Sequence, residues 1–298
     1  MQLPFIKKNE PQKNFFVSLI IAPYRVGAIL FEEINSKLFI LSSREEEVGK
    51  NANDLSAEEL LTAADHVISF VETSLPEGGN LDKTIFSVPH DWIIDGKIAQ
   101  EHLVKLKRIC QDLGLTPVGY LISVEAIISY LTNQEGAPVS AIFVEIANKQ
   151  IIVYLVRAGK ILEVHSGEVE ENVLATTESL LKKIVKVDVL PSKILLLDYK
   201  DGAESQQEFV SHTWPKDIPF LHVPQVTVLE KGIENEATIN GVAQQMELEV
   251  LQDAPKSELA REEIAEESAL PIFKEEKPDE KVEEKIEEAA PEEFGFMK

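Results

Sequence analysis

The sequence predicts an α/β protein of two similar lobes, because the same order of elements occurs twice along its 298 residues. Each half opens with three short apolar runs separated by turn-forming residues, which is typical of an antiparallel meander. In each half, helical patterns that alternate with buried strands follow the meander. A duplication at this long period indicates two mixed sheets, each with helices on its faces.

The first half begins with the runs FFVSLIIA, VGAILFE and KLFILSS, which predict three consecutive antiparallel strands. A helix is expected from Ser56 to Pro76, because Ser56 and Glu59 fit a capping box and apolar residues follow at helical spacing. The segments TIFSVP and PVGYLIS then predict strands, and residues 98–113 and 124–131 predict helices. The apolar positions of the first helix are Leu60, Ala64, Val67, Phe70 and Val71.

The second half repeats the pattern with SAIFVEIA, QIIVYLVRAGKI and ILEVHSGEV, and Ala158-Gly159 provide a tight turn between the last two runs. A helix is expected over residues 170–185, followed by the strand KILLLDY and a short polar helix over 204–211. The run PFLHVP, from Pro219, predicts the final strand.

These patterns divide the chain into a leader (1–13), a first lobe (14–135), a second lobe (136–246) and an acidic tail (247–298). High charge with proline and few aromatic residues predicts that the tail is disordered. Its last stretch is different, because Phe294, Phe296 and Met297 restore apolar character after the acidic spacer. These three residues are candidates for docking to a partner, and an arbitrary chain end is the alternative.

The net charge of −23 is shared between the tail and the lobes. Residues 256–298 carry 15 acidic and 7 basic residues, a net charge of −8, which leaves −15 for the rest of the chain. A body this acidic repels phosphate backbones, so we expect protein or small-molecule partners and no nucleic acid. The lysines Lys182, Lys183 and Lys186 predict a solvated helix face, with a docking patch for acidic partners as the alternative.

The leading residues MQLPFIKKNEPQKN lack the apolar core of a secretory signal, and no stretch approaches the ~20 apolar residues of a spanning helix. We therefore expect a cytoplasmic chain, which partners could bring to the inner face of the membrane. The single cysteine, Cys110, lies in a helical pattern and is interpreted as a small buried hydrophobe. The adjacent pair His90-Asp91, after a predicted strand, is a weaker candidate for acid–base chemistry.

Three segments carry a resemblance to a known family: TIFSVPHDWIIDG, DLGLTPVGYLISVEAIISYL with Glu125-Ala126 at its crossover, and SAIFVEIANKQIIVYLVRAGKI. They resemble the actin-like superfamily, and within it the FtsA and PilM type of bacterial cell-division and pilus-assembly proteins. The resemblance covers about residues 14–246. It implies two RNase H-like lobes that face each other across a cleft, where active members bind ATP with magnesium.

In active members the first turn of each meander carries an acidic residue and glycines, which hold magnesium-bound water and bring backbone N–H groups to phosphate. In this sequence Ile20 stands at the acidic position of the first turn, Ala22 at a glycine position and Pro23 at a hydroxyl position. Proline removes an N–H donor and isoleucine cannot coordinate magnesium. The first phosphate turn is therefore degenerate.

The second phosphate turn is partly retained, because Glu145 holds the acidic position while Ala147 replaces a glycine. Asn148 and Lys149 could still reach a phosphate. The adenosine turn, rich in glycines in the family, is represented by LLLDYKDGAE with Gly202 alone. A weaker candidate for this turn is INGVAQQM, with Gly241.

These departures favour a non-catalytic, actin-like scaffold or adaptor in an envelope-associated assembly of the cell-division or pilus-like kind, with no cofactor. The resemblance alone supplies the envelope setting and the expectation of membrane-anchored protein partners. An ATP-binding actin-like ATPase with atypical phosphate loops is the alternative, and its cofactor would be ATP with magnesium. A structural module within a longer architecture is a third possibility.

Overall fold

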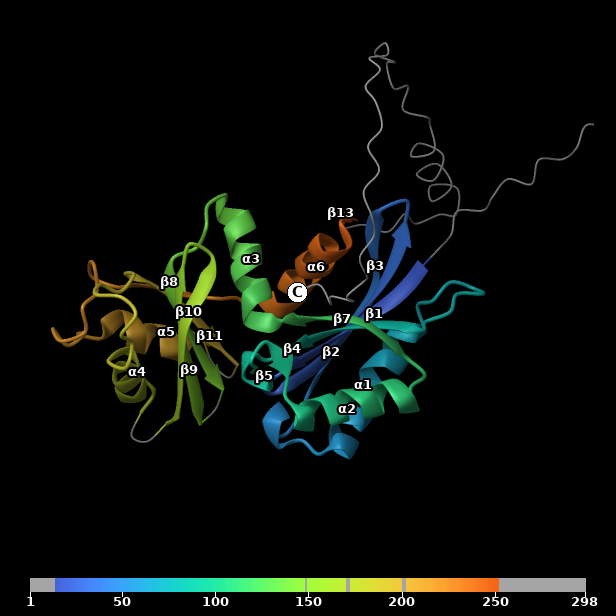
Figure 1. Cartoon of the computed structure of the whole chain (residues 1–298), viewed down its shortest axis with the longest axis horizontal. Helices are drawn as coiled ribbons and strands as arrows, with labels where there is room; N and C mark the ends of the chain where they lie inside the picture. Colours follow the sequence, from blue (N-terminus) through green and yellow to red (C-terminus); the bar gives the residue numbers. More distant parts are fainter. Residues whose placement is uncertain (1–13, 148, 170–171, 200–201, 252–298) are drawn as a thin grey trace, which may run out of the picture.

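The structure, a computed structural model, describes residues 14–147, 149–169, 172–199 and 202–251. These residues form a six-stranded sheet, a five-stranded sheet and a small two-stranded ribbon. Figure 1 shows the two larger sheets in separate lobes, with helices α3 (Ser123–Glu135) and α6 (Ile233–Met246) between them. The predicted fold class, two α/β lobes with mixed sheets, is confirmed.

The first sheet has the strand order β13-β3-β2-β1-β4-β7. The predicted meander forms its antiparallel part, and two later strands extend the sheet parallel to β1. Every residue of β1 after Asn14 is buried, because helices cover both faces of this strand. The strands are β1 (Asn14–Ala22), β2 (Arg25–Ile34), β3 (Lys37–Glu47), β4 (Lys83–Val88), β7 (Thr116–Ile122) and β13 (Glu249–Leu251).

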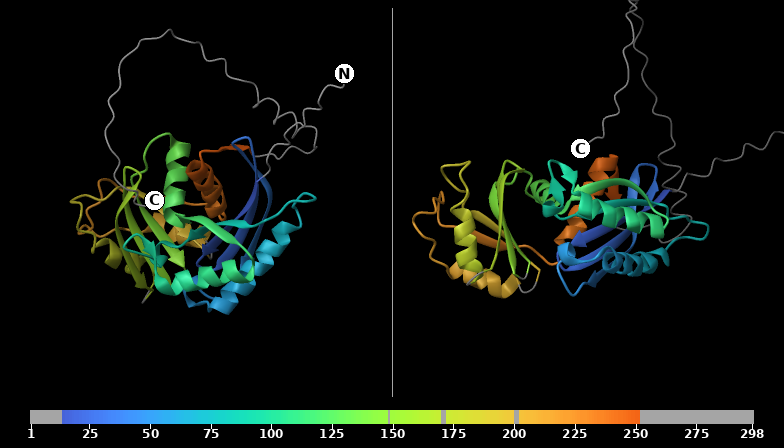
Figure 2. Two further views of the ribbon diagram at one scale, coloured as in Figure 1. Left: turned by 45° about the vertical axis from the view of Figure 1, so that its right-hand side comes forward. Right: turned by 60° about the horizontal axis from the view of Figure 1, so that its bottom comes forward.

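Two helices, α1 (Ala57–Glu72) and α2 (Gln100–Asp112), pack on one face of this sheet (Figure 2). Helix α2 starts later than predicted, because Ile98 pairs with Ile93 in the ribbon of β5 (Ile93–Ile94) and β6 (Lys97–Ile98). Cys110 is half-buried against this core, and burial raises the pKa of its thiol, in line with a packing role. Two short 3-10 turns, η1 (Ala52–Asp54) and η2 (His90–Trp92), complete the lobe.

The second sheet has the order β10-β9-β8-β11-β12, which repeats the order of the first. The turn between β9 and β10 has left-handed residues at Ala158 (φ 49°) and Gly159 (φ 74°), as a tight hairpin requires. Helices α4 (Val173–Leu181) and α5 (Gly202–Ser211) belong to this lobe. The strands are β8 (Ala141–Ala147), β9 (Gln150–Arg157), β10 (Lys160–Glu168), β11 (Lys193–Asp198) and β12 (Gln225–Val228).

Several sequence predictions for the second lobe were wrong in detail. The run from Pro219 is not the last strand: Phe220 forms only an isolated bridge with Leu190, because its flanking prolines cannot donate to a ladder. Helix α4 ends at Leu181, so the lysines expected on its face lie at its end and in the loop that follows. The tail was placed too early, because residues 249–251 pair with β3.

Helix α6 was not predicted as a helix at all. It begins after Gly232 (φ 87°) and contains Gly241, and a glycine inside a helix costs about 1 kcal/mol relative to alanine. Its packing explains that glycine, because an added Cβ would lie 3.0 Å from Leu121 and 3.7 Å from Ala126. Tertiary packing against α3 and β7 therefore stabilises a segment with weak helical propensity.

The predicted capping box of α1 is confirmed and gives a direct test. The Glu59 N–H donates to Ser56 Oγ (3.2 Å), and the Ser56 N–H donates to the Glu59 carboxylate (2.8 Å). We expect Ser56→Ala to lower the free energy of unfolding by about 1 kcal/mol. Urea denaturation should show the loss, while Ser69→Ala, within the same helix, should cost less than half as much. Equal effects of the two substitutions would contradict a role for the cap.

One apolar position of α1 points outward instead of into the core. Phe70 is 47% exposed, and the guanidinium of Arg44 lies 5.0 Å from the centre of its ring. The other four predicted positions of this helix are buried. The contact between the Arg44 cation and the face of the Phe70 ring accounts for this exposed phenylalanine, so no partner protein is needed to explain it.

Candidate functional site

The first degenerate turn lies between β1 and β2 and faces its own lobe. Ala22 and Pro23 are buried, and the Pro23 carbonyl accepts a hydrogen bond from the Ala52 N–H (2.7 Å). Ile20, at the position of the family's carboxylate, is buried in an apolar cluster that includes Ile239 of α6. The turn therefore offers neither a carboxylate nor a row of free N–H donors to a phosphate.

The second turn, between β8 and β9, retains its acidic residue in a closed setting. Glu145 is buried on β8, and its carboxylate accepts hydrogen bonds from the hydroxyls of Tyr154 (2.8 Å) and Tyr199 (3.1 Å). Ala147 is buried, Lys149 is exposed, and Asn148 lies outside the described residues. Both oxygens of the Glu145 carboxylate are thus engaged by tyrosines of the same lobe.

Burial changes the protonation of this group. It raises the pKa of Glu145 from 4.5 to about 7, against the two tyrosine hydrogen bonds, which favour the carboxylate. Burial and the neighbouring Glu145 also raise the pKa of Tyr154 and of Tyr199 well above their usual range, so both hydroxyls remain donors. Near neutral pH, Glu145 is therefore present in both its neutral and its charged form.

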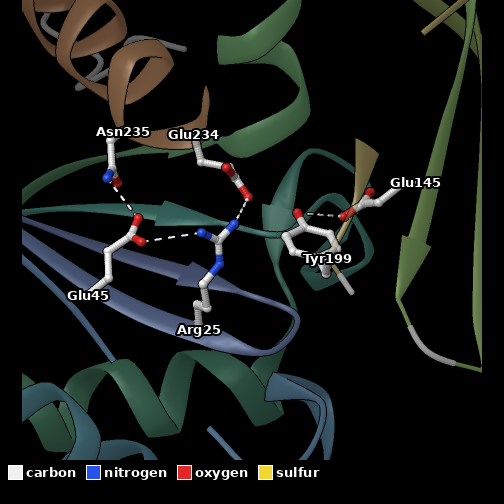
Figure 3. Close-up of polar contacts among 6 residues, drawn as sticks. All are labelled: Arg25, Glu45, Glu145, Tyr199, Glu234 and Asn235. Atoms are coloured by element: carbon white, nitrogen blue, oxygen red, sulfur yellow. Dashed lines mark hydrogen bonds and ion pairs between the residues drawn. The ribbon is translucent and has the colours of Figure 1, made fainter. Parts of the chain in front are cut away.

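Arg25, directly after the first turn, joins this cluster to the rest of the molecule (Figure 3). Its guanidinium forms ion pairs with Glu234 (2.9 Å), in the first turn of α6, and with Glu45 on β3 (3.2 Å). The same guanidinium lies 5.7 Å from the centre of the Tyr199 ring, on the opposite lobe. Asn235 completes the network by donating to Glu45 (2.7 Å). The Arg25 side chain therefore contacts three elements at once: β3, α6 and the end of β11.

The Arg25 pair also controls the charge of Glu234. Burial raises the pKa of this carboxyl above its ordinary value, and the positive charge of Arg25 opposes the increase. Only 3% of the Glu234 side chain is exposed. A carboxylate at this depth needs its cation, because an unpaired buried charge is strongly unfavourable.

His90 and Asp91 lie beside this network but not as an acid–base pair. The edge of the His90 ring packs on Tyr154, with centroids 5.5 Å apart, and burial lowers the pKa of the imidazole. Asp91 instead accepts a hydrogen bond from the side chain of Asn53 (2.6 Å). His90 thus extends the contact between the lobes as a neutral aromatic group.

The two candidate adenosine turns do not meet. Gly202 is the first residue of α5, after residues 200 and 201, which lie outside the described residues. Gly241 lies in the middle of α6, where it permits close packing against Leu121 and Ala126. The candidate docking residues Phe294, Phe296 and Met297 also lie outside the described residues.

The residues present do not fit magnesium ATP. The first turn has Ile20 where a carboxylate would hold magnesium-bound water, and the Glu145 carboxylate is engaged by two tyrosines. Within the described part of the chain, no group of histidine, cysteine and acidic side chains is arranged to hold a metal ion. A surface depression of about 470 Å³ lies elsewhere, between the end of β3 and α1, and is lined in part by Glu46, Lys50, Glu59 and His66.

Of the residues in this network, Glu145 was predicted from the sequence, whereas Arg25, Tyr154, Tyr199 and Glu234 were not. Arg25 could have been noticed, because it is a lone cation directly after a phosphate-turn position. Glu234 could not, because 209 residues separate it from Arg25 and its helix was not predicted.

Apart from β13, the two sheets share one order of five strands, each a meander extended by two parallel strands, and this repeat defines a duplicated actin-like fold. Among solved structures, the chain is similar to the PilM–PilN type IV pilus biogenesis complex, with 10% identity over 77% of this chain and 98% of that one and a TM-score of 0.47. It is also similar to the ethanolamine utilization protein EutJ from Carboxydothermus hydrogenoformans, with 12% identity, coverage of 79% and 91%, and a TM-score of 0.46.

A third similar structure is a Ppx/GppA family member from Aquifex aeolicus, with 14% identity, coverage of 68% and 72%, and a TM-score of 0.35. No protein-family model matches the chain, and no curated protein matches it. Over the described residues, no helix is both long and apolar enough to cross a membrane.

Proposed function

We propose that this chain is a non-catalytic, actin-like scaffold or adaptor that holds protein partners without using ATP. The observation that carries the proposal is the network around Arg25 and Glu145, which places protein side chains where the resemblance puts phosphate. Arg25 is held by two carboxylates and Glu145 by two hydroxyls. The two groups that could contact a nucleotide, Arg25 and Glu145, are thus each engaged by other side chains of the protein.

Catalysis of phosphoryl transfer depends on positioned donors, a metal and a group that orients the attacking water. The first turn supplies none of these, because it carries Ile20, Ala22 and Pro23. Glu145 and Glu234 would add negative charge beside a polyanion, which disfavours its binding. We infer that the function of the protein lies on the outer surfaces of its two lobes, where partners bind.

The setting in an envelope-associated assembly of the cell-division or pilus-like kind rests on the sequence resemblance to FtsA and PilM. Membrane-anchored proteins are the partners that this resemblance suggests.

Titration with magnesium ATP tests the proposal. We expect no heat of binding, a shift in melting temperature below about 1 °C at 1 mM nucleotide, and no phosphate release. A site with a Kd of about 10 μM would stabilise the protein by ~2.7 kcal/mol at that concentration, which thermal shift readily detects. Clear stabilisation together with turnover that Glu145→Gln abolishes would establish the ATPase alternative instead.

The scaffold role has its own test. Partners crosslinked to the tagged chain in its native cells should be the same proteins after ATP depletion as before it, and they should include envelope proteins. Partners that are lost when ATP is removed would contradict a nucleotide-independent scaffold.

A further inference from the structure

The second lobe carries exposed aliphatic and basic side chains at the end of its sheet away from Glu145. Strand β9 ends there at Arg157, and β11 begins there at Lys193. We call residues 157–163, 182–192 and 219–224 the distal surface. The first range is the end of β9, its turn and the start of β10, and the other two lie in the yellow and orange loops of the left-hand lobe in Figure 1. Val185 is 80% exposed and Val223 is 86% exposed. The other exposed aliphatic residues of the distal surface are Leu162, Val189 and Leu221.

Hydrogen bonds between the loops make the distal surface continuous. The Arg157 guanidinium donates to the Val189 carbonyl (2.6 Å), and Lys186 Nζ donates to the Leu162 carbonyl (2.7 Å). The Leu221 N–H donates to the Leu190 carbonyl (3.0 Å). Clustered aliphatic residues on adjoining loops mark interaction sites, unlike single exposed ones.

The distal surface is basic in a chain whose net charge is −23. Arg157 and Lys186 donate to backbone carbonyls, and Lys183 is exposed beside them. Three carboxylates lie nearby. Asp217 pairs with Lys182 (2.9 Å), and Asp188 is exposed. The carboxylate of Glu163 accepts hydrogen bonds from the N–H groups of residues 185 and 186 and from the ring of His165, so Lys183 and Lys186 are the lysines left for a ligand. A complementary ligand would combine carboxylates with large apolar side chains.

The chain itself contains such a segment. Residues 287–297, EEAAPEEFGFM, carry four glutamates, two phenylalanines and a methionine, with no basic residue. The 35 residues between the last described residue and this segment could span about 115 Å at full extension, so the segment can reach any face of the two lobes.

We propose that residues 287–297 dock on the distal surface of their own chain. Phe294 and Phe296 pack against the exposed aliphatic side chains, and the glutamates face Lys183 and Lys186. Aromatic anchors in an apolar patch with a charged rim are the usual anatomy of a short-peptide site. This inference does not depend on whether the cleft binds ATP.

Photo-crosslinking of the full chain tests the docking. With p-benzoylphenylalanine at position 296, we expect crosslinks to peptides that contain residues 183–189 or 219–224. Val118 on β7, which is 52% exposed, is an apolar control site in the other lobe, and we expect no crosslinks to it. Crosslinks spread over both lobes, or none to the distal surface, would overturn the proposal.

Charge reversal supplies the matched comparison. Lys183→Glu with Lys186→Glu should lower the crosslinking yield at least fivefold, whereas Lys97→Glu with Lys107→Glu, two exposed lysines of the first lobe, should leave it unchanged. Melting temperatures of both variants verify folding. A yield that is independent of dilution places the contact within one chain; a yield that falls in proportion to dilution would show docking on a second copy and refute the proposal as stated.

Discussion

Replacing Arg25 with methionine should be among the most destabilising single changes in this protein, at about 3 kcal/mol near pH 8. The substitution keeps much of the side-chain volume but removes the cation from Glu234, whose side chain is only 3% exposed. Removing one partner of a buried pair costs about 3 to 5 kcal/mol, because the remaining charge stays buried without compensation. We expect the low end, because 18% of the Arg25 side chain is exposed. Urea denaturation measures the loss.

The chain offers a matched control for this prediction. Arg108 also pairs with two carboxylates, Glu58 and Asp112, but 44% of its side chain is exposed. Arg108→Met should therefore cost less than about 1 kcal/mol, as exposed pairs do.

A double variant separates the charge effect from lost packing. Arg25→Met combined with Glu234→Gln removes the stranded charge, and we expect it to recover at least half of the lost stability. If the double variant is as unstable as Arg25→Met with an intact Glu234, the buried charge is not the cause.

The strands of the two meanders, together with β4, β7 and β11, could be predicted because they are apolar runs broken by turn residues. Strand β1 is buried from Phe15 onward, so its sequence is almost continuously apolar and lacks the alternation of polar and apolar faces that would suggest a helix. The capping box at Ser56 located the start of α1 to within a residue, because its two hydrogen bonds are local. Local chemistry was sufficient wherever the stabilising contacts lie within a few residues.

Long-range packing determines the features that the sequence did not reveal. Helix α6 contains Gly241 and follows Gly232, so its propensity is poor and its contacts with α3 and β7 stabilise it. The ion pair of Arg25 with Glu234 depends on that helix being present. The site was therefore predictable only in part: the degenerate turns are visible in the sequence, but the side chains that take their place are not.

Glu145 and Tyr199 lie at the carboxyl ends of the neighbouring parallel strands β8 and β11. This is where open α/β sheets normally bind their ligands. In this chain the position is occupied by an internal carboxyl–tyrosine cluster and by the guanidinium of Arg25. The fold thus keeps the geometry of a ligand site and uses it to join its two lobes.

Replacing Glu145 with glutamine should make the stability of the protein less sensitive to a rise in pH from 4.5 to about 7. The folded-state pKa of Glu145 is raised from 4.5 to about 7, chiefly by burial. Between these two values the folded protein binds more protons than the unfolded chain, so the stability of the unmodified protein falls as pH rises. The full difference corresponds to about 3 kcal/mol above pH 7, from 1.36 kcal/mol per pKa unit.

Glutamine retains an oxygen that the hydroxyls of Tyr154 and Tyr199 can reach, but it has no charge to bury. We therefore expect the stability of Glu145→Gln relative to the unmodified protein to increase by about 3 kcal/mol from pH 4.5 to pH 8. Denaturation curves across this range measure it. Glu163→Gln is the control, because hydrogen bonds from His165 and from backbone N–H groups outweigh its desolvation and lower the pKa of Glu163. The stability that Glu163 contributes is lost only as pH falls below 4.5, so the difference between Glu163→Gln and the unmodified protein should stay nearly constant from pH 4.5 to pH 8. A constant difference between Glu145→Gln and the unmodified protein over the whole range would show that Glu145 is already charged at acidic pH, and that burial does not control its protonation.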